Sequence, residues 1–243
     1  MFGLFNKTQK QSTLPLLVDM HSHLLPGIDD GVKKVEETIY ILKQFKNLGY
    51  KKIITTPHVM SDYYPNSNED ILSKLEETND IIDKHNIGIT LQAAAEYYLD
   101  ETLLQRLSNH EELLSFGHKY ILFETSFLNK PVFLEEAVFT MNTQGYQPIL
   151  AHPERYPYLQ GNQTLLDKLK NMNLLFQLNI LSLTGYYSPE VKKFAIYLLK
   201  SNMIDFVGTD CHNALQANEI TRKMNNKYFR LFGSKNILNS SLL

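Results

Sequence analysis

Residues 18–31 read VDMHSHLLPGIDDG, and this short stretch gathers five side chains of the metal-ligand type. His21 and His23 stand one residue apart, and Asp29 and Asp30 follow within nine positions of His21. At the end of a strand, residues i and i+2 share a face, so both imidazoles would point the same way. Imidazole and carboxylate donors suit Zn, Mn and Fe. Chemistry at a bound cation is therefore the first possibility that this stretch raises.

Residues of the same types recur along the chain, each at the end of a short apolar run. They are His58 in TTPH, Glu96 in AAAEYY, Glu124 in ILFETS, His152 in ILAHPER, and Asp210 and His212 in VGTDCH. Any one of them alone would more often be a satisfied polar residue, but the joint pattern favours metal. The candidates outnumber the three or four ligands of one zinc site, so we expect two or three cations with Glu96 as a bridge. The remaining histidines, interpreted as surface or structural residues, are His85, His110 and His118.

Short apolar runs alternate with amphipathic segments, and these are the predicted strands and helices. The strands are Leu16–Met20, Lys52–Thr56, Thr90–Glu96, Tyr120–Thr125, Pro148–Ala151, Leu174–Asn179 and Ile204–Thr209. The helices are Val35–Leu48, Glu69–His85, Glu101–Leu107, Val132–Thr143, Thr164–Lys170 and Pro189–Lys200. Strand–helix alternation without a hairpin signal predicts a parallel α/β sheet, and this length favours a closed or nearly closed barrel. The carboxyl ends of barrel strands open on one face, where the candidate ligands would converge.

Composition narrows the class of protein. The length of 243 residues suits one domain over residues 16–243. A net charge of −2 and a pI near 6.4 predict neither a nucleic-acid surface nor a strong anionic-membrane surface. The single cysteine, Cys211, indicates a reducing, cytoplasmic location, and no run is long enough to span a membrane. Residues 1–15 are expected to be a flexible segment whose MFGLF patch is too short for a signal peptide; a weak membrane-surface anchor is the alternative.

The motifs HSHLLPGIDDG, TTPH, AAAEYYLD, FE, AHPERY and TDCHN resemble, in this order, those of the PHP (polymerase and histidinol phosphatase) superfamily. They are most similar to the bacterial manganese-dependent protein-tyrosine phosphatases of capsular and exopolysaccharide gene clusters. The likeness spans residues 19–213. It implies a distorted TIM-like (β/α)7 barrel, the PHP fold, with three divalent metal ions, Mn being favoured and Fe or Zn compatible with the donors. Matching positions imply His21, His23, Glu96 and Asp210 for the first ion, Glu96, Glu124 and His152 for the second, and Asp30, His58 and His212 for the third.

The resemblance also implies an activity and a partner. It implies a metal-dependent phosphatase that hydrolyses phosphotyrosine by metal-bound hydroxide, acting on the tyrosine-rich tail of a bacterial tyrosine kinase of polysaccharide export. Arg155 and His58 are the expected catalytic residues, and Arg155 would bind the phosphate. Stacking of Tyr63 or Tyr64 on the phosphotyrosine ring is a further expectation.

One departure from the family pattern concerns the phosphate. The family usually places an arginine shortly after the segment that matches DCHN. Here the first arginine after it is Arg222. Either Arg222 or a nearby lysine substitutes for it, or phosphate binding is weaker.

Three other hypotheses fit the same motifs. A PHP phosphoesterase could act on a small metabolite such as histidinol phosphate, and the loop Asp62–Pro65 would decide between substrates. A DNA-processing exonuclease of the superfamily is disfavoured by the lack of a basic stripe. A non-catalytic metal-binding regulatory module is the third. A cysteine phosphatase is excluded, because six residues after Cys211 stands Ala217 in place of the required arginine.

Overall fold

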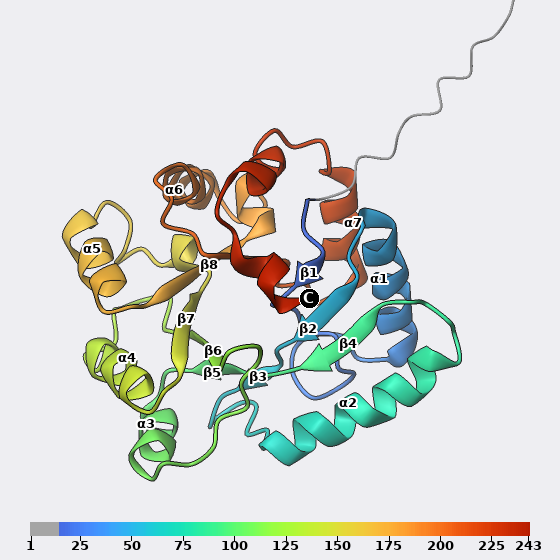
Figure 1. Cartoon of the computed structure of the whole chain (residues 1–243), viewed down its shortest axis with the longest axis horizontal. Coiled ribbons are helices and arrows are strands. Elements are labelled where there is room, and N and C mark those ends of the chain that lie inside the picture. Colours follow the sequence, from blue (N-terminus) through green and yellow to red (C-terminus); the bar gives the residue numbers. More distant parts are fainter. Residues whose placement is uncertain (1–14) are drawn as a thin grey trace, which may run out of the picture.

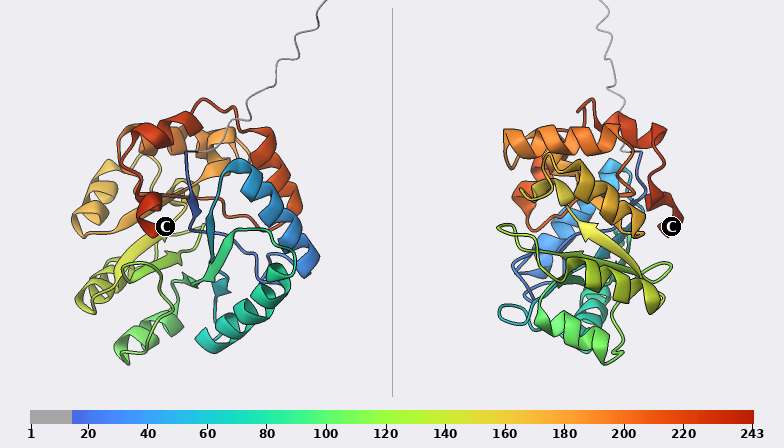
Figure 2. Two further views of the ribbon diagram at one scale, coloured as in Figure 1. Left: turned by 45° about the vertical axis from the view of Figure 1, so that its right-hand side comes forward. Right: turned by 90° about the vertical axis from the view of Figure 1, so that its left-hand side faces the viewer.

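The computed structural model describes residues 15–243, so the segment 1–15 predicted to be flexible lies outside it except for Pro15. Short strands lie at the centre and helices surround them (Figures 1 and 2). The strands are β1 Val18–Asp19, β2 Lys52–Thr55, β3 His58–Val59, β4 Thr90–Ala93, β5 Glu96–Tyr98, β6 Tyr120–Glu124, β7 Gln147–Ala151, β8 Leu175–Asn179 and β9 Phe206–Gly208. All the pairings between them are parallel, as predicted.

The strands form two sheets, β1-β2-β4 and β3-β5-β6-β7-β8-β9. Only two residues separate β2 from β3 and β4 from β5, so each pair occupies one strand position that is interrupted. The prediction that Glu96 ends its strand was wrong, because Glu96 begins β5 and pairs in register with His58, which begins β3. The interruptions let two proposed ligands start new strand segments beside each other.

The first and last strands meet without a ladder. An isolated bridge joins Ser22 to Cys211, and the carboxylate of Asp19 accepts hydrogen bonds from the backbone N and the hydroxyl of Thr209, at 2.8 and 2.6 Å. Buried apolar side chains, among them Val18, Ile54 and Leu122, fill the space between the strands. This irregular junction is the distortion that the resemblance implied.

Six of the seven α-helices in residues 15–243 match predicted segments to within a few residues, and α7 is additional. They are α1 Val35–Leu48, α2 Asn68–Asp83, α3 Glu101–Ser108, α4 Leu134–Thr143, α5 Gln163–Asn171, α6 Pro189–Lys200 and α7 Ala214–Arg222. Gly49, with φ of 106°, ends α1, and Pro189 opens α6 behind a Ser188 cap. The predicted start of α4 at Val132 was wrong, since Val132 lies outside the helix and is 93% exposed. No helix in residues 15–243 combines the length and apolar character needed to cross a bilayer.

Four short 3-10 helices complete the fold: η1 Pro153–Arg155, η2 Ile180–Thr184, η3 Phe229–Ser234 and η4 Leu238–Leu242. The last of them covers the amino ends of the strands. Asn239 accepts a hydrogen bond from Val207 N and donates to the carbonyls of Val18 and Val207. Lys52, the first residue of β2, donates to the carbonyl of Leu242 at 2.7 Å. The amino ends are thus closed by the C-terminal segment, and the carboxyl ends remain for the site.

Candidate metal centre

The predicted ligands meet at the carboxyl ends of the strands. His21 Nε2 lies 3.2 Å from Glu96 Oε2 and 3.4 Å from Asp210 Oδ1. His23 Nε2 lies 3.4 Å from each of the same two oxygens. Two donors bound to one cation at roughly 2.1 Å stand about 3.0–3.4 Å apart at angles of about 90–109°. These four side chains therefore have the mutual spacing of a ligand set.

A second group of side chains, His152, His58 and Glu124, also surrounds Glu96. His152 Nε2 lies 3.3 Å from Glu96 Oε1 and 3.8 Å from Glu124 Oε2. His58 Nδ1 lies 3.1 Å from Glu96 Oε2 and 3.3 Å from Glu124 Oε1. Glu96 therefore stands between two groups of imidazoles, which is the position of a bridging carboxylate.

The third group lies nearer the surface. Asp30 Oδ1 is 3.4 Å from His58 Nε2 and 3.5 Å from His212 Nε2, and the Asp30 side chain is half exposed. His23 completes a group of four with them, its ring stacked on that of His212 at 3.9 Å. His58 thus faces two groups, one through each ring nitrogen, whereas the resemblance assigned it to one. By contrast, His85, His110 and His118 are exposed, in line with their interpretation as surface residues.

The state of Glu96 tests whether cations fit this cluster. Its side chain is fully buried, and neither carboxylate oxygen has a hydrogen-bond partner. Burying a carboxylate is costly unless its charge is compensated, and here the imidazoles of His21, His58 and His152 lie 3.1–3.3 Å from its oxygens. Burial raises its pKa, but the charges of His21 and His58 outweigh burial and hold the pKa well below its usual value. A buried carboxylate that faces several imidazoles fits divalent cations.

The pKa values of Glu96 and Glu124 are shifted in opposite directions, and the surroundings of His152 favour its neutral form. Burial and the negative charge of Glu96 raise the pKa of Glu124 well above its usual value. Burial and the nearby Arg155 lower the pKa of His152 to about 4. His152 is therefore neutral near pH 7, which is the form that binds a metal.

Two side chains orient the first pair of histidines. Gln177 Oε1 accepts from His21 Nδ1 at 2.8 Å, and Asp29 Oδ2 accepts from His23 Nδ1 at 2.7 Å. Each contact leaves Nε2 free to face the cluster, as in other metal sites. The sequence alone left Asp29 and Asp30 as alternatives; here Asp29 supports a histidine and Asp30 faces the third group. Sequence analysis missed Gln177, because a buried glutamine in a strand has no motif of its own.

Backbone strain is stored at the cluster. His152 has φ of 34° and Asp210 has φ of 50°, both in the left-handed region that costs about 1–3 kcal/mol for such residues. Two glycines let the chain pass close by: a Cβ on Gly31 would lie 2.3 Å from the carbonyl of His23, and one on Gly208 would lie 2.6 Å from His21 Cβ. These backbone conformations and close approaches therefore direct the proposed ligands toward the cluster.

Arg155 stands at the edge of the cluster with its guanidinium held on three sides. Its Nη1 lies 3.0 Å from Asp210 Oδ2, and the rings of Phe127 and Tyr187 lie 4.6 and 4.7 Å from its Cζ. Asn179 Nδ2 donates to the same Asp210 oxygen at 2.7 Å. The side chain is still a quarter exposed, so an anion can reach it. Sequence analysis did not identify the aromatic pair that positions this arginine.

The suggestion that Arg222 replaces the missing arginine was wrong. Arg222 lies in the last turn of α7 and pairs with Glu219. A helix of this length separates it from Asn213, at the start of α7, by about 13 Å. Arg155 is accordingly the arginine placed at the cluster.

The two tyrosines of the β3–α2 loop differ in position. The ring of Tyr64 stacks on His58, with centroids 5.8 Å apart, whereas Tyr63 is 74% exposed and has no ring partner among the described residues. Tyr64 is thus the one of the pair that lies against a proposed ligand.

Cys211 has no access to the cluster. Its side chain is fully buried among core residues, and burial raises the pKa of the thiol far above its usual value. A thiolate nucleophile at this position is therefore excluded, in agreement with the sequence analysis.

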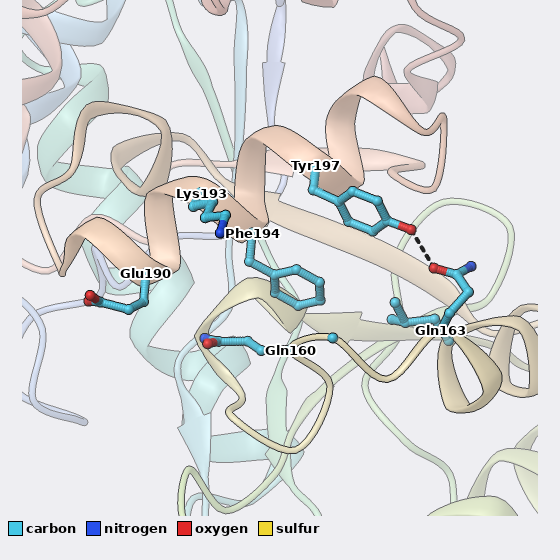
Figure 3. A pocket seen from close by; sticks show the side chains of 8 residues that line it. Gln160, Gln163, Glu190, Lys193, Phe194 and Tyr197 are labelled. Atoms are coloured by element: carbon cyan, nitrogen blue, oxygen red, sulfur yellow. Dashed lines mark hydrogen bonds between the residues drawn. The ribbon is translucent and has the colours of Figure 1, made fainter.

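A cavity of about 500 Å³ lies apart from the histidines, between the start of α5 and α6 (Figure 3). Phe194 and Leu166 give it an apolar wall, and Tyr197 hydrogen-bonds to Gln163 at its edge. Its lining contains no histidine. The chemistry described above therefore belongs to the metal cluster and not to this cavity.

Comparison with known proteins shows which family and which solved structures this chain is similar to. Residues 17–237 match the family model described as capsular polysaccharide synthesis, CpsB/CapC. The chain is 30% identical over 197 residues to the putative tyrosine-protein phosphatase CapC of Staphylococcus aureus, covering 81% of this chain and 77% of that protein. It superposes with a TM-score of 0.80 and 30% identity on a chain from the crystal structures of YwqE from Bacillus subtilis and CpsB from Streptococcus pneumoniae, which are described as unique metal-dependent tyrosine phosphatases. This match covers 93% of this chain and 90% of the other. Histidinol phosphate phosphatase of Lactococcus lactis, at 16% identity, a TM-score of 0.52 and coverage of 89% and 94%, shares the fold alone.

Proposed function

The chain belongs to the CpsB/CapC capsular polysaccharide synthesis family, and from this membership we propose that it is a metal-dependent protein-tyrosine phosphatase. Its relatives carry that activity in their names. The single observation that supports it most is the buried Glu96, whose two oxygens lie within 3.4 Å of the imidazoles of four histidines. An array of this kind suits a doubly charged phosphate ester better than a neutral substrate.

The proposed ligand sets are those that the family resemblance implies. His21, His23, Glu96 and Asp210 would hold one cation, Glu96, Glu124 and His152 a second, and Asp30, His58 and His212 a third. Bound cations would supply Lewis acidity that lowers the pKa of water and neutralises phosphoryl charge. Manganese is proposed from the family resemblance; the donors also suit Fe and Zn.

The protein residues would orient the ester. Arg155 would donate two N–H groups to phosphoryl oxygens, since the flanking rings of Phe127 and Tyr187 fix its plane. Tyr64, beside His58, would contact the phenyl ring of the substrate. The leaving group is a phenol with a pKa near 10, so it departs with less protonation than an alcohol needs. A tyrosine ester is therefore the substrate that demands least from a site with no assigned general acid.

The proposed substrate is a phosphotyrosyl protein, namely the tyrosine-rich tail of a tyrosine kinase of polysaccharide export, as the capsule context of the family supports. The cytoplasmic location expected from the single cysteine stays a prediction. A phosphatase acting on histidinol phosphate is the second candidate, supported by the shared fold.

The test compares substrates and variants. With manganese added, the protein should hydrolyse a phosphotyrosyl peptide much faster than a phosphoseryl peptide or histidinol phosphate. The His58→Ala variant should lose about 10²–10³-fold in kcat, whereas His85→Ala, which changes an exposed histidine, should match the wild type. Preference for histidinol phosphate would overturn the substrate and keep the metal centre. No hydrolysis of any of the three esters would favour a non-catalytic metal-binding module.

A further inference from the structure

The peptide group that follows Glu124 is held from both sides. The carbonyl of Glu124 accepts a hydrogen bond from Leu99 N at 2.9 Å. The ladder between β6 and β7 stops one residue short of Glu124, so it offers no acceptor to the next backbone N–H, that of Thr125. Thr125 N donates instead to the hydroxyl of Tyr156, at 3.1 Å. A side chain from outside the sheet therefore satisfies the backbone directly behind a proposed ligand.

A second tyrosine holds the same residue. The hydroxyl of Tyr158 hydrogen-bonds to Thr125 Oγ1 at 2.6 Å, and Thr125 is fully buried. The rings of Tyr156 and Tyr158 stack on each other, with centroids 5.3 Å apart and planes 18° apart. Both tyrosines follow Arg155 in the segment after β7. The end of β6 is thus tied to the loop that carries His152 and Arg155.

His152, which belongs with Glu124 to the second proposed ligand set, lacks the hydrogen bond that orients the first pair of histidines. His21 and His23 each bind a side chain through Nδ1, whereas Nδ1 of His152 is buried and has no hydrogen-bond partner in residues 15–243. The His152 ring packs instead against Phe127 and Tyr156, each with its centroid 5.7 Å away, and these two rings lie 5.4 Å from each other. Ring packing therefore holds this imidazole where a hydrogen bond holds the others.

Tyr156 is the one side chain that takes part in both arrangements. It is fully buried, so it can act only through its neighbours and not on a substrate. We propose that Tyr156 is a positioning residue of the second cation site: its ring fixes the His152 imidazole and its hydroxyl fixes the backbone beside Glu124. Tyr156 thereby sets the separation of two ligands that come from different strands, 3.8 Å between His152 Nε2 and Glu124 Oε2. This role rests on the metal-dependent function proposed above.

The test is manganese binding to the metal-free protein, measured by isothermal titration calorimetry. Tyr156→Phe keeps the ring and removes the acceptor of Thr125 N, so one class of sites should bind about 10–100-fold more weakly. Tyr146→Phe is the matched control, because the Tyr146 hydroxyl also accepts from a backbone N–H, that of Leu113 at 3.1 Å, but lies before the amino end of β7. This variant should bind manganese like the wild type.

Urea denaturation of the metal-free proteins separates positioning from general stability. Both Tyr→Phe variants leave one backbone N–H without its acceptor, so both urea midpoints should fall by similar amounts, whereas only Tyr156→Phe should lose manganese affinity. Tyr156→Leu removes the ring as well and should weaken binding further. Manganese affinity that is unchanged in Tyr156→Phe, or reduced equally in Tyr146→Phe, would overturn the role of Tyr156. A wild type that binds neither manganese nor zinc would overturn the proposed function, and this role with it.

Discussion

Glu96 and Asn239 are both fully buried polar residues, but they lie at opposite ends of the strands. At the amino ends, the Asn239 amide accepts one backbone hydrogen bond and donates two. At the carboxyl ends, neither oxygen of Glu96 has a hydrogen bond, and four imidazoles lie within 3.4 Å of these oxygens. The polar groups at the amino end are satisfied by the protein itself, whereas those at the carboxyl end have the arrangement of a candidate metal site. Mutations at the carboxyl ends should therefore reduce metal binding and activity, whereas mutations at the amino ends should reduce the stability of the fold.

The largest expected effect is at the incomplete end. Glu96→Gln removes the bridging charge, so it should lower phosphatase activity about 10³-fold and abolish binding of at least one cation. Metal content by mass spectrometry and initial rates on a phosphotyrosyl peptide measure both. Glu101→Gln, which changes an exposed glutamate of α3, is the control. Full metal content in Glu96→Gln would contradict the proposal that Glu96 helps to hold a cation at the carboxyl ends of the strands.

Asn239→Ala tests the complete end. It leaves backbone groups of Val18 and Val207 buried without partners, so the free energy of unfolding should fall by about 3 kcal/mol. Urea denaturation measures the loss. Metal content and kcat should stay as in the wild type; a parallel loss of metal would show that the two ends are coupled.

Glu154 is a buried acid near the carboxyl ends that faces no proposed cation. Burial raises its pKa to about 7, although Ser182 Oγ and Asn179 N both donate to its Oε1. Its stabilising contribution is therefore complete below its ordinary pKa of 4.5 and is lost as the pH rises through about 7. Glu154→Gln keeps an oxygen for both donors and cannot ionise. Relative to the wild type, it should gain about 2–3 kcal/mol between pH 5 and pH 8 in urea denaturation. An unchanged pH dependence would mean that Glu154 ionises freely.

The smallest effect is expected from a change at Asp29, which accepts a hydrogen bond from the proposed ligand His23. Asp29→Asn weakens the hold on His23 Nδ1, so the affinity for manganese should fall about 10–100-fold while the fold persists. Competition with a chromogenic chelator measures the affinity. Asp167→Asn, on the exposed side of α5, provides a matched control. An unchanged affinity would move Asp29 to a purely structural role through its contact with Gly31 N.

Much of this site could be predicted from the sequence because most of its residues share one position, the end of a short apolar run. His21, Glu124 and His152 each follow an apolar run, and a parallel sheet brings such positions to one face. The interruption before Glu96 could not be predicted, since nothing in AAAEYY distinguishes a broken strand from a continuous one. Gln177 reaches the site only through a contact 156 residues away in the sequence. The position of Arg222 depended on the length of α7, which a motif does not encode.

The junction of β1 with β9 has a consequence for the order of assembly. Asp19 and Thr209 are 190 residues apart in the sequence, and the candidate ligands run from His21 near the start to His212 near the end. Contacts of such separation form late, because most of the chain must first be ordered. During synthesis, His21 and His23 leave the ribosome long before Asp210 exists. The proposed first ligand set therefore cannot be complete until Asp210 has been synthesised.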